Sequence, residues 1–274
     1  HLIQPAPGTA LVYLDWSQQE LGIAAALSRD PGLQRAYLEG DPYIDFAVRA
    51  GLVPAGATKA SHPREREACK ACSLGTLYGM GEISLSLSAG ISQPEAAELL
   101  RLHRRTYPQF WRWRDAAITY AMLIGNIHST FGWRLHVTGQ TNPRTLANFP
   151  MQANGAEMLR LAICFAHEAG VHICAPIHDA LLIEAPLGEI DVAVDLCSTA
   201  MEEASRVVLD GFPLRTEVAV VRFPDRYQEP RGAETWDTII RILIELEPER
   251  TRAALGVTEA DRYLSGSVTP GQSI

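Results

Sequence analysis

Residues 10–21 read Ala-Leu-Val-Tyr-Leu-Asp-Trp-Ser-Gln-Gln-Glu-Leu, and this stretch decides the fold. Its apolar beginning, residues 10–16, predicts a buried strand that ends at Asp15, followed by a helix through about Ser28. A carboxylate at the end of an apolar strand loses hydration, which costs free energy unless another group compensates it. Asp15 is therefore a candidate for chemistry, although a single aspartate at such a position is more often a turn residue or a helix cap.

A second aspartate stands at the tip of a predicted hairpin. Two short apolar runs, 171–177 and 181–185, flank the sequence His178-Asp179-Ala180. Asp15 and Asp179 would repel each other if folding brought them together, and a divalent cation between them would remove that conflict. Taken alone, Asp179 too is more often a turn residue, so the pair does not by itself establish a site.

The chain between the two aspartates predicts mostly helices. Residues 31–60 predict short helices, and residues 127–138 predict a hairpin. Longer helices are expected at about 63–79, 93–106, 108–124, 151–169, 188–209 and 234–247, with a strand at 214–222 and a disordered end. Because strands from distant parts of the chain flank a helical block, we predict an α+β fold. A small antiparallel sheet would carry both aspartates, with the helices inserted.

The composition is that of a globular protein, with 47% hydrophobic and 20% charged residues. No apolar run reaches the roughly 18–20 residues that a membrane helix needs, so we expect no membrane contact and a cytoplasmic location. The net charge of −8 argues weakly against nucleic-acid binding. Arginines nevertheless cluster locally, and the group at 101–114 fits a solvated helix face and DNA contact equally well.

Cys69 and Cys72 form a C-x-x-C sequence, which invites a metal-binding or redox interpretation. A second Cys/His pair for a zinc site is absent from the sequence, and the spacing lies within a predicted helix. Helix packing is therefore the favoured interpretation, with the thiols reduced.

Four residues spaced by four, Arg66, Lys70, Leu74 and Tyr78, lie along one face of a predicted helix. That face has two cations at one end and an apolar and aromatic surface at the other. Such a strip suits a nucleoside triphosphate, with charge for its phosphates and a flat contact for its base and sugar. Gly75, beside the strip, would let a base pair approach closely. An ordinary amphipathic helix would not need this alignment.

Four short motifs resemble those of family A DNA polymerases, the group of bacterial DNA polymerase I. Residues 15–21 resemble the family's D-Y-S-Q-I-E-L, and residues 177–180 resemble V-H-D-E. Residues 66–79 have the form R-x-x-x-K-x-x-x-L-G-x-x-Y-G, where the family has F in place of L. Residues 144–152 match R-x-x-x-N-x-P-M-Q. All four occur in the family's order, so the set is far more specific than any single string.

The resemblance implies template-directed addition of deoxynucleotides to a primer 3′-hydroxyl. The implied partners are primer–template DNA and deoxynucleoside triphosphates. It also implies two Mg²⁺ ions, with Mn²⁺ as a substitute, held by Asp15, Asp179 and the backbone carbonyl of Trp16. The expected subdomains are palm at 1–30 and 136–228, fingers at 31–135, and a C-terminal tail at 229–274.

The resemblance also assigns the remaining site residues. Lys70 is expected to hold the triphosphate together with Arg66 and, as a catalytic residue, to protonate the leaving pyrophosphate. Glu20 matches the residue that closes over the sugar and excludes a 2′-hydroxyl. The other nucleotide-binding positions are Gln18, Tyr43, Leu74 and Tyr78, and the DNA-binding positions are Arg144, Asn148, Gln152 and His178.

The sequence departs from the family's pattern in several places. Leu74 replaces an aromatic residue, Ala180 replaces the glutamate that follows the second aspartate, and Tyr43 stands where a phosphate-contacting histidine is common. Only fourteen residues precede Asp15, and the first of them is His1 rather than Met. We therefore expect the thumb to come from an N-terminal region of a longer chain or from a partner chain.

Two other functions remain open on the sequence alone. One is a thumbless, inactive module that keeps the polymerase-like core for DNA binding or regulation. The intact Asp15, Asp179, Arg66 and Lys70 argue against it. The other is an RNA-synthesising enzyme, and Glu20 argues against that.

Overall fold

In the computed structural model, which describes residues 3–227 and 230–255, the chain forms two compact units. The larger unit consists of Val12–Ile183 and Asp191–Ala219. The smaller unit holds the other described residues, so the division falls within strands β1, β5 and β6. The assignment of palm and fingers to these residues stays a prediction.

A four-stranded sheet has the order β4-β5-β1-β6. Its strands are β4 (Ile173–Ile177), β5 (Ala180–Pro186), β1 (Thr9–Trp16) and β6 (Thr216–Arg222). β4 and β5 are antiparallel, with Ile177 opposite Ala180 across the turn. Together with the helices, this sheet confirms the predicted α+β fold, in which the two aspartate-bearing segments are neighbours.

Strand β1 alternates between buried and half-buried positions, as a strand packed on one face should. Val12, Leu14 and Trp16 are fully or almost fully buried, whereas Tyr13 and Asp15 are half-buried. The Trp16 indole donates a hydrogen bond to the Met201 carbonyl of α9 at 3.3 Å, so α9 covers the buried face of β1. The opposite face is left to carry Asp15.

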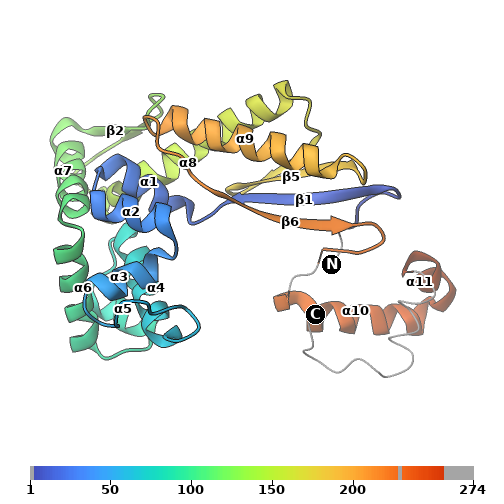
Figure 1. Cartoon of the computed structure of the whole chain (residues 1–274), viewed down its shortest axis with the longest axis horizontal. Helices are drawn as coiled ribbons and strands as arrows, with labels where there is room; N and C mark the ends of the chain where they lie inside the picture. The colour runs from blue at the N-terminus through green and yellow to red at the C-terminus, as the bar shows by residue number, and fades with distance from the viewer. Residues whose placement is uncertain (1–2, 228–229, 256–274) are drawn as a thin grey trace. The chain divides into compact units, whose positions relative to one another are not determined.

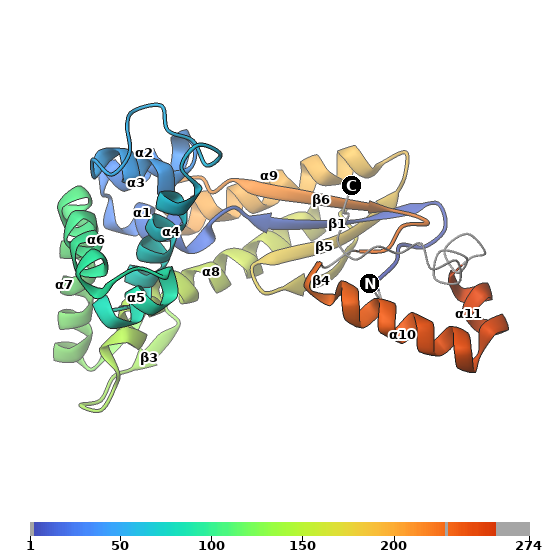
Figure 2. The ribbon, with the colours of Figure 1, turned by 90° about the horizontal axis from the view of Figure 1, so that it is seen from below.

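The larger unit is otherwise helical, with one small hairpin. Figures 1 and 2 show α1 to α7 grouped beyond one end of the sheet, whereas α9 runs alongside it. The helices are α1 (Gln19–Ser28), α2 (Pro31–Glu39), α3 (Pro42–Arg49), α4 (Pro63–Leu77), α5 (Glu82–Ala89), α6 (Gln93–Thr106), α7 (Pro108–Ile124), α8 (Pro143–Glu168) and α9 (Ile190–Val208), and the hairpin is β2 (Asn126–His128) with β3 (Arg134–His136).

Most of these elements match the sequence prediction, and two differ. Helix α8 begins at Pro143 rather than near 151, because the Asn142 side chain accepts a hydrogen bond from the Arg144 amide and caps it there. The helix continues through Pro150. Helix α5 was not predicted, because its apolar residues alternate with polar ones in the pattern of a strand.

The smaller unit contains the beginning of the chain and two helices after β6. The Ala6 amide and the Thr9 hydroxyl both donate to Glu184 Oε1, at 3.0 and 2.6 Å. The helices are α10 (Ala233–Leu246) and α11 (Pro248–Leu255), so part of the end predicted to be disordered is helical, and the rest lies outside the described residues. No helix in the described part of the chain is long and apolar enough to cross a lipid bilayer.

Asp30, only 2% exposed, caps two helices at once. Its Oδ1 accepts from the amides of Gly32 (3.0 Å) and Leu33 (3.1 Å) at the start of α2. Its Oδ2 accepts from the amides of Gln109 (2.9 Å) and Phe110 (3.2 Å) at the start of α7. Because both helix N-termini carry partial positive charge, one carboxylate compensates both and fixes the two helices together.

We expect Asp30→Ala to lower the free energy of unfolding by about 1–4 kcal/mol, since each of the two lost caps costs about 0.5–2 kcal/mol. Urea unfolding of the chain measures the change. Ser92→Ala is the control, because Ser92 caps only α6, and it should cost about 1 kcal/mol. Equal losses in the two variants would show that Asp30 does not join two helices energetically.

Candidate functional site

The two aspartates predicted from the sequence meet at one end of the sheet. Asp15 is the last residue but one of β1, and Asp179 lies in the turn between β4 and β5. Because β5 is a neighbour of β1, the turn is brought to the end of β1. His178 takes the left-handed conformation (φ 56°) in this turn, and its Nδ1 lies 3.1 Å from Asp179 Oδ1.

A third carboxylate, Glu217 on β6, belongs to the same group. The Ser17 amide donates to the Arg215 carbonyl at 2.8 Å, which fixes the antiparallel register of β1 and β6. Counting two residues along each strand places Asp15 opposite Glu217. The Ser17 hydroxyl donates to Glu217 Oε1 at 2.7 Å. The sequence analysis missed Glu217, because nothing in the sequence around it reveals that β6 pairs with β1.

The electrostatics of this group favour a bound cation. Burial raises the pKa of the Asp15 carboxyl, and the negative charges of Asp179 and Glu217 raise it further, against a backbone hydrogen bond that lowers it. Within the described residues, no lysine or arginine forms a salt bridge with any of the three carboxylates. Clustered carboxylate oxygens are the donors that Mg²⁺ and Mn²⁺ prefer, so these residues fit a divalent cation.

Glu20, in the first turn of α1, joins three helices. The Tyr78 hydroxyl, at the end of α4, donates to Glu20 Oε1, and the Gln152 amide of α8 donates to the same oxygen. Burial, followed by the hydrogen bond to Glu20, raises the pKa of Tyr78 to about 12, so the phenol keeps its proton at neutral pH. Glu20 is thus held in a fixed position by donors from two other elements.

The strip on α4 is formed, with Arg66, Lys70 and Leu74 half-buried and Tyr78 exposed. Arg66 is already matched by acids: its Nε donates to Asp41 Oδ2 and its Nη1 to Glu67 Oε1, each at 2.6 Å.

Tyr43, which is almost fully buried, lies under the Arg66 guanidinium at 5.3 Å from ring centroid to Cζ. Burial raises the pKa of Tyr43 to about 12, so its hydroxyl is a neutral partner next to the cation.

Gly75 lies against the turn that follows α4. A side chain there would meet Met80, with its Cβ 3.0 Å from Met80 Sδ and 3.2 Å from Met80 Cβ. The space is therefore occupied by the turn that follows α4, and Gly75 lets this turn fold back on the helix. On the same helix, Cys69 and Cys72 are fully buried. Burial raises the pKa of Cys69 to about 12, which agrees with packing rather than redox chemistry.

The four predicted DNA-binding positions come from two elements. Arg144, Asn148 and Gln152 recur every four residues along α8, so they share one face of that helix. Arg144 packs close to Gly79, where an added Cβ would lie 3.1 Å from Arg144 Cγ. His178 is 78% exposed in the β4–β5 turn. Gln18, between β1 and α1, has a buried Oε1 without a hydrogen bond to any described residue.

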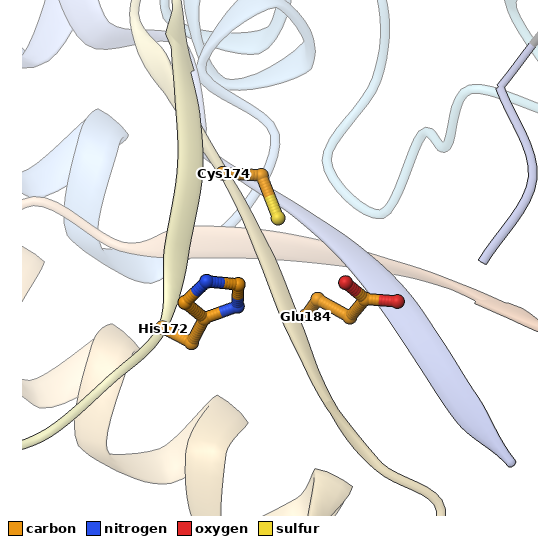
Figure 3. A group of neighbouring side chains, drawn as sticks. All are labelled: His172, Cys174 and Glu184. Atoms are coloured by element: carbon orange, nitrogen blue, oxygen red, sulfur yellow. The ribbon is translucent and has the colours of Figure 1, made fainter. Parts of the chain in front are cut away.

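One further pair of ligand-type side chains lies at the other end of β4. Figure 3 shows His172 and Cys174, which are separated by one residue and are both exposed. A structural zinc site takes four protein ligands and a catalytic site three. His172 and Cys174 supply two ligand atoms of these types.

Comparison with known proteins gives a consistent result. A sequence profile of DNA polymerase family A matches residues 1–222. DNA polymerase I of Deinococcus radiodurans is 30% identical over 225 residues, which cover 77% of this chain and 23% of that protein. The thermostable DNA polymerase I of Thermus thermophilus is 30% identical over 227 residues, covering 78% of this chain and 26% of that protein. The chain thus spans about a quarter of the length of these relatives.

A solved structure resembles the fold as well. It is the polymerase domain of Pol1 from M. smegmatis in complex with a DNA primer–template and dNTP. The TM-score is 0.70 at 26% identity, and the match covers 80% of this chain and 41% of that one.

We expect Asp15→Asn to raise the melting temperature of the metal-free chain at neutral pH. Because the folded-state pKa of Asp15 is raised, the native state binds more protons than the unfolded state. The stability of the native state therefore falls as the pH rises from the ordinary pKa of an aspartate through the raised pKa of Asp15. The asparagine side chain does not ionise, so the variant lacks this loss of stability. Melting curves in a chelator from about pH 4 to 8 test it.

The exposed Asp195→Asn on α9 is the control for loss of one charge and should leave the pH dependence unchanged. If the Asp15 variant melted at the wild-type temperature across the whole range, Asp15 would not be under electrostatic strain.

Proposed function

This chain belongs to DNA polymerase family A, and on that premise we propose that it adds deoxynucleotides to a primer 3′-hydroxyl in the order set by a template strand. The observation that carries the proposal is the meeting of Asp15 and Asp179 at adjacent strand ends, with no lysine or arginine paired to either carboxylate among the described residues. The similar Pol1 structure was solved with a primer–template and dNTP, which supports the same partners for this chain.

Asp15 and Asp179, with the backbone carbonyl of Trp16, would hold the divalent ions, which we propose to be two Mg²⁺ that Mn²⁺ can replace. When bound, such a pair lowers the pKa of the attacking hydroxyl and stabilises the departing pyrophosphate. The protein's own part is to fix the oxygen ligands in place. β1 does this for Asp15 through sheet hydrogen bonds on both edges, and the β4–β5 turn does it for Asp179.

Arg66 and Lys70 would bind the triphosphate along the strip of α4. The two carboxylates that hold Arg66 orient its guanidinium, and Tyr43 supports it from below. Lys70, one turn further along and half-buried, is the residue that we propose to protonate the leaving pyrophosphate. Leu74 offers the incoming sugar a surface without the stacking of an aromatic ring.

Glu20 would exclude nucleotides that carry a 2′-hydroxyl. Two donors from Tyr78 and Gln152 fix its carboxylate, so it cannot easily move aside for a larger sugar. Tyr78 would then stand beside the templating base, and Gln18 would contribute to the nucleotide pocket. On the product side, the α8 face of Arg144, Asn148 and Gln152 would bind the primer–template together with His178.

We assign no segment of the described residues to a thumb, and the chain spans only about a quarter of the length of its relatives. We propose that a further region of a longer chain, or a partner chain, supplies the DNA contacts of a thumb. The competing function is a DNA-binding or regulatory module without turnover. A primer-extension assay distinguishes the two functions.

We expect the chain to extend a primer in the presence of Mg²⁺, and Asp179→Asn to reduce extension by more than about 100-fold. Loss of residues that only support metal ligands already costs about 10–100-fold. Single-nucleotide extension with excess enzyme over DNA measures the rate independently of weak DNA binding. Asp195→Asn should extend at the wild-type rate. DNA binding without extension by the wild-type chain would establish the inactive module instead.

We expect Glu20→Ala to raise the use of ribonucleotides relative to deoxynucleotides by about 10-fold or more, the range in which shape exclusion of a small group operates. The ratio of kcat/KM for the two sugars gives the answer. Glu20→Gln keeps the side-chain size and should retain most of the exclusion. An unchanged ratio in the alanine variant would remove Glu20 from this role.

A further inference from the structure

The carboxylate group at the end of β1 contains a residue outside all four sequence motifs, Glu217. Asp15 and Glu217 face each other on adjacent antiparallel strands. Directly opposite residues in such a pair have Cβ atoms about 4.5–5.5 Å apart, and like charges there destabilise the sheet. The alternating period of a strand also puts the two side chains on the same face of the sheet as each other.

Glu217 is oriented by its surroundings. Its Oε1 accepts from the Ser17 hydroxyl, and its other oxygen has no hydrogen bond to a described residue. Ser17 itself is 8% exposed and is fixed by its backbone: the Tyr37 hydroxyl donates to its carbonyl at 2.9 Å. Tyr37 also accepts from the Arg215 amide at 3.1 Å, which ties β6 to the same point. One Glu217 oxygen is therefore positioned while the other stays available.

The residue that follows Asp179 offers no alternative ligand. Ala180 is fully buried and opposite Ile177, and its side chain has no oxygen. A third side-chain carboxylate for the site therefore has to come from another strand, and β6 is the strand on the free side of β1.

We propose that Glu217 is the third carboxylate ligand of the divalent-cation site of Asp15 and Asp179, positioned by the Ser17 hydroxyl. The inference rests on the proposed function only in taking the cation to be the one that the two aspartates hold. It accounts for a glutamate opposite an aspartate: the cation compensates a repulsion that would otherwise persist in the sheet.

The test measures binding of Mn²⁺ to the whole chain without DNA or nucleotide. The electron paramagnetic resonance signal of the free ion reports how much Mn²⁺ stays unbound. We expect Glu217→Gln to weaken Mn²⁺ binding by about 10-fold or more. Glu217→Asp keeps the charge but shortens the side chain. It should bind Mn²⁺ more weakly than the wild type and more tightly than Glu217→Gln. Glu203→Gln, on an exposed position of α9, removes the same charge elsewhere and should bind as the wild type does.

Melting of the same variants separates a ligand from a purely structural residue. Glu217→Gln should melt at or above the wild-type temperature in a chelator, because one like charge is gone, and should gain less than the wild type when Mn²⁺ is added. A lower melting temperature in the chelator, with an undiminished gain from Mn²⁺, would assign Glu217 to the fold alone and overturn the inference.

Asp15→Asn distinguishes this inference from the proposed function. If Asp15→Asn loses Mn²⁺ binding while Glu217→Gln binds as the wild type does, the aspartate site stands and Glu217 is not a ligand. If neither substitution changes Mn²⁺ binding, the cation site itself is wrong, and the inference falls with it.

Discussion

Strand β1 hydrogen-bonds to β5 on one edge and to β6 on the other, and this central position constrains the rest of the larger unit. Its buried face packs under α9 through Trp16, which leaves Asp15 on the opposite face. Its two neighbours then bring Asp179 from one side and Glu217 from the other. The sheet therefore concentrates negative charge that its own hydrogen bonds cannot neutralise, and a divalent cation is the simplest compensation.

In the helical part of the larger unit, charged side chains are paired within the protein. Asp30 is neutralised by backbone amides of two helices, and Arg66 by Asp41 and Glu67. These groups have opposite charges or helix N-termini beside them, whereas among the described residues no lysine or arginine pairs with the carboxylates on β1, β6 and the β4–β5 turn. The contrast marks the end of β1 as the place where this chain is built to take a ligand of opposite charge.

The sequence predicted the α+β class, most helices and the two aspartates, because the alternation along β1 and the motif spacing are local signals. It also predicted the four-residue spacing on α4, which the structure retains as one strip. It missed Glu217, whose partner across the sheet lies in the first β-strand, and no local pattern encodes such a pairing. It did not predict that Met80 folds back onto Gly75, because this contact depends on the turn at Gly79, which has a positive φ (67°). The serine-rich α5 was missed for a similar reason: its alternation of apolar and polar residues imitates a strand.

The strand order also determines when this architecture can assemble as the chain is made. β1 is synthesised well before both of its partners: within the described chain, β5 follows only after eight helices (α1 to α8), a small hairpin and β4, and β6 comes later still. At typical rates of synthesis, β1 waits on the order of ten to thirty seconds for β5. During that interval its backbone edges are unpaired and its apolar residues uncovered, the condition that recruits chaperones or promotes association with other nascent chains. The helices of the inserted block make mostly local contacts and can fold while β1 waits, so the end of the sheet that carries Asp15 is the last part of the larger unit to form.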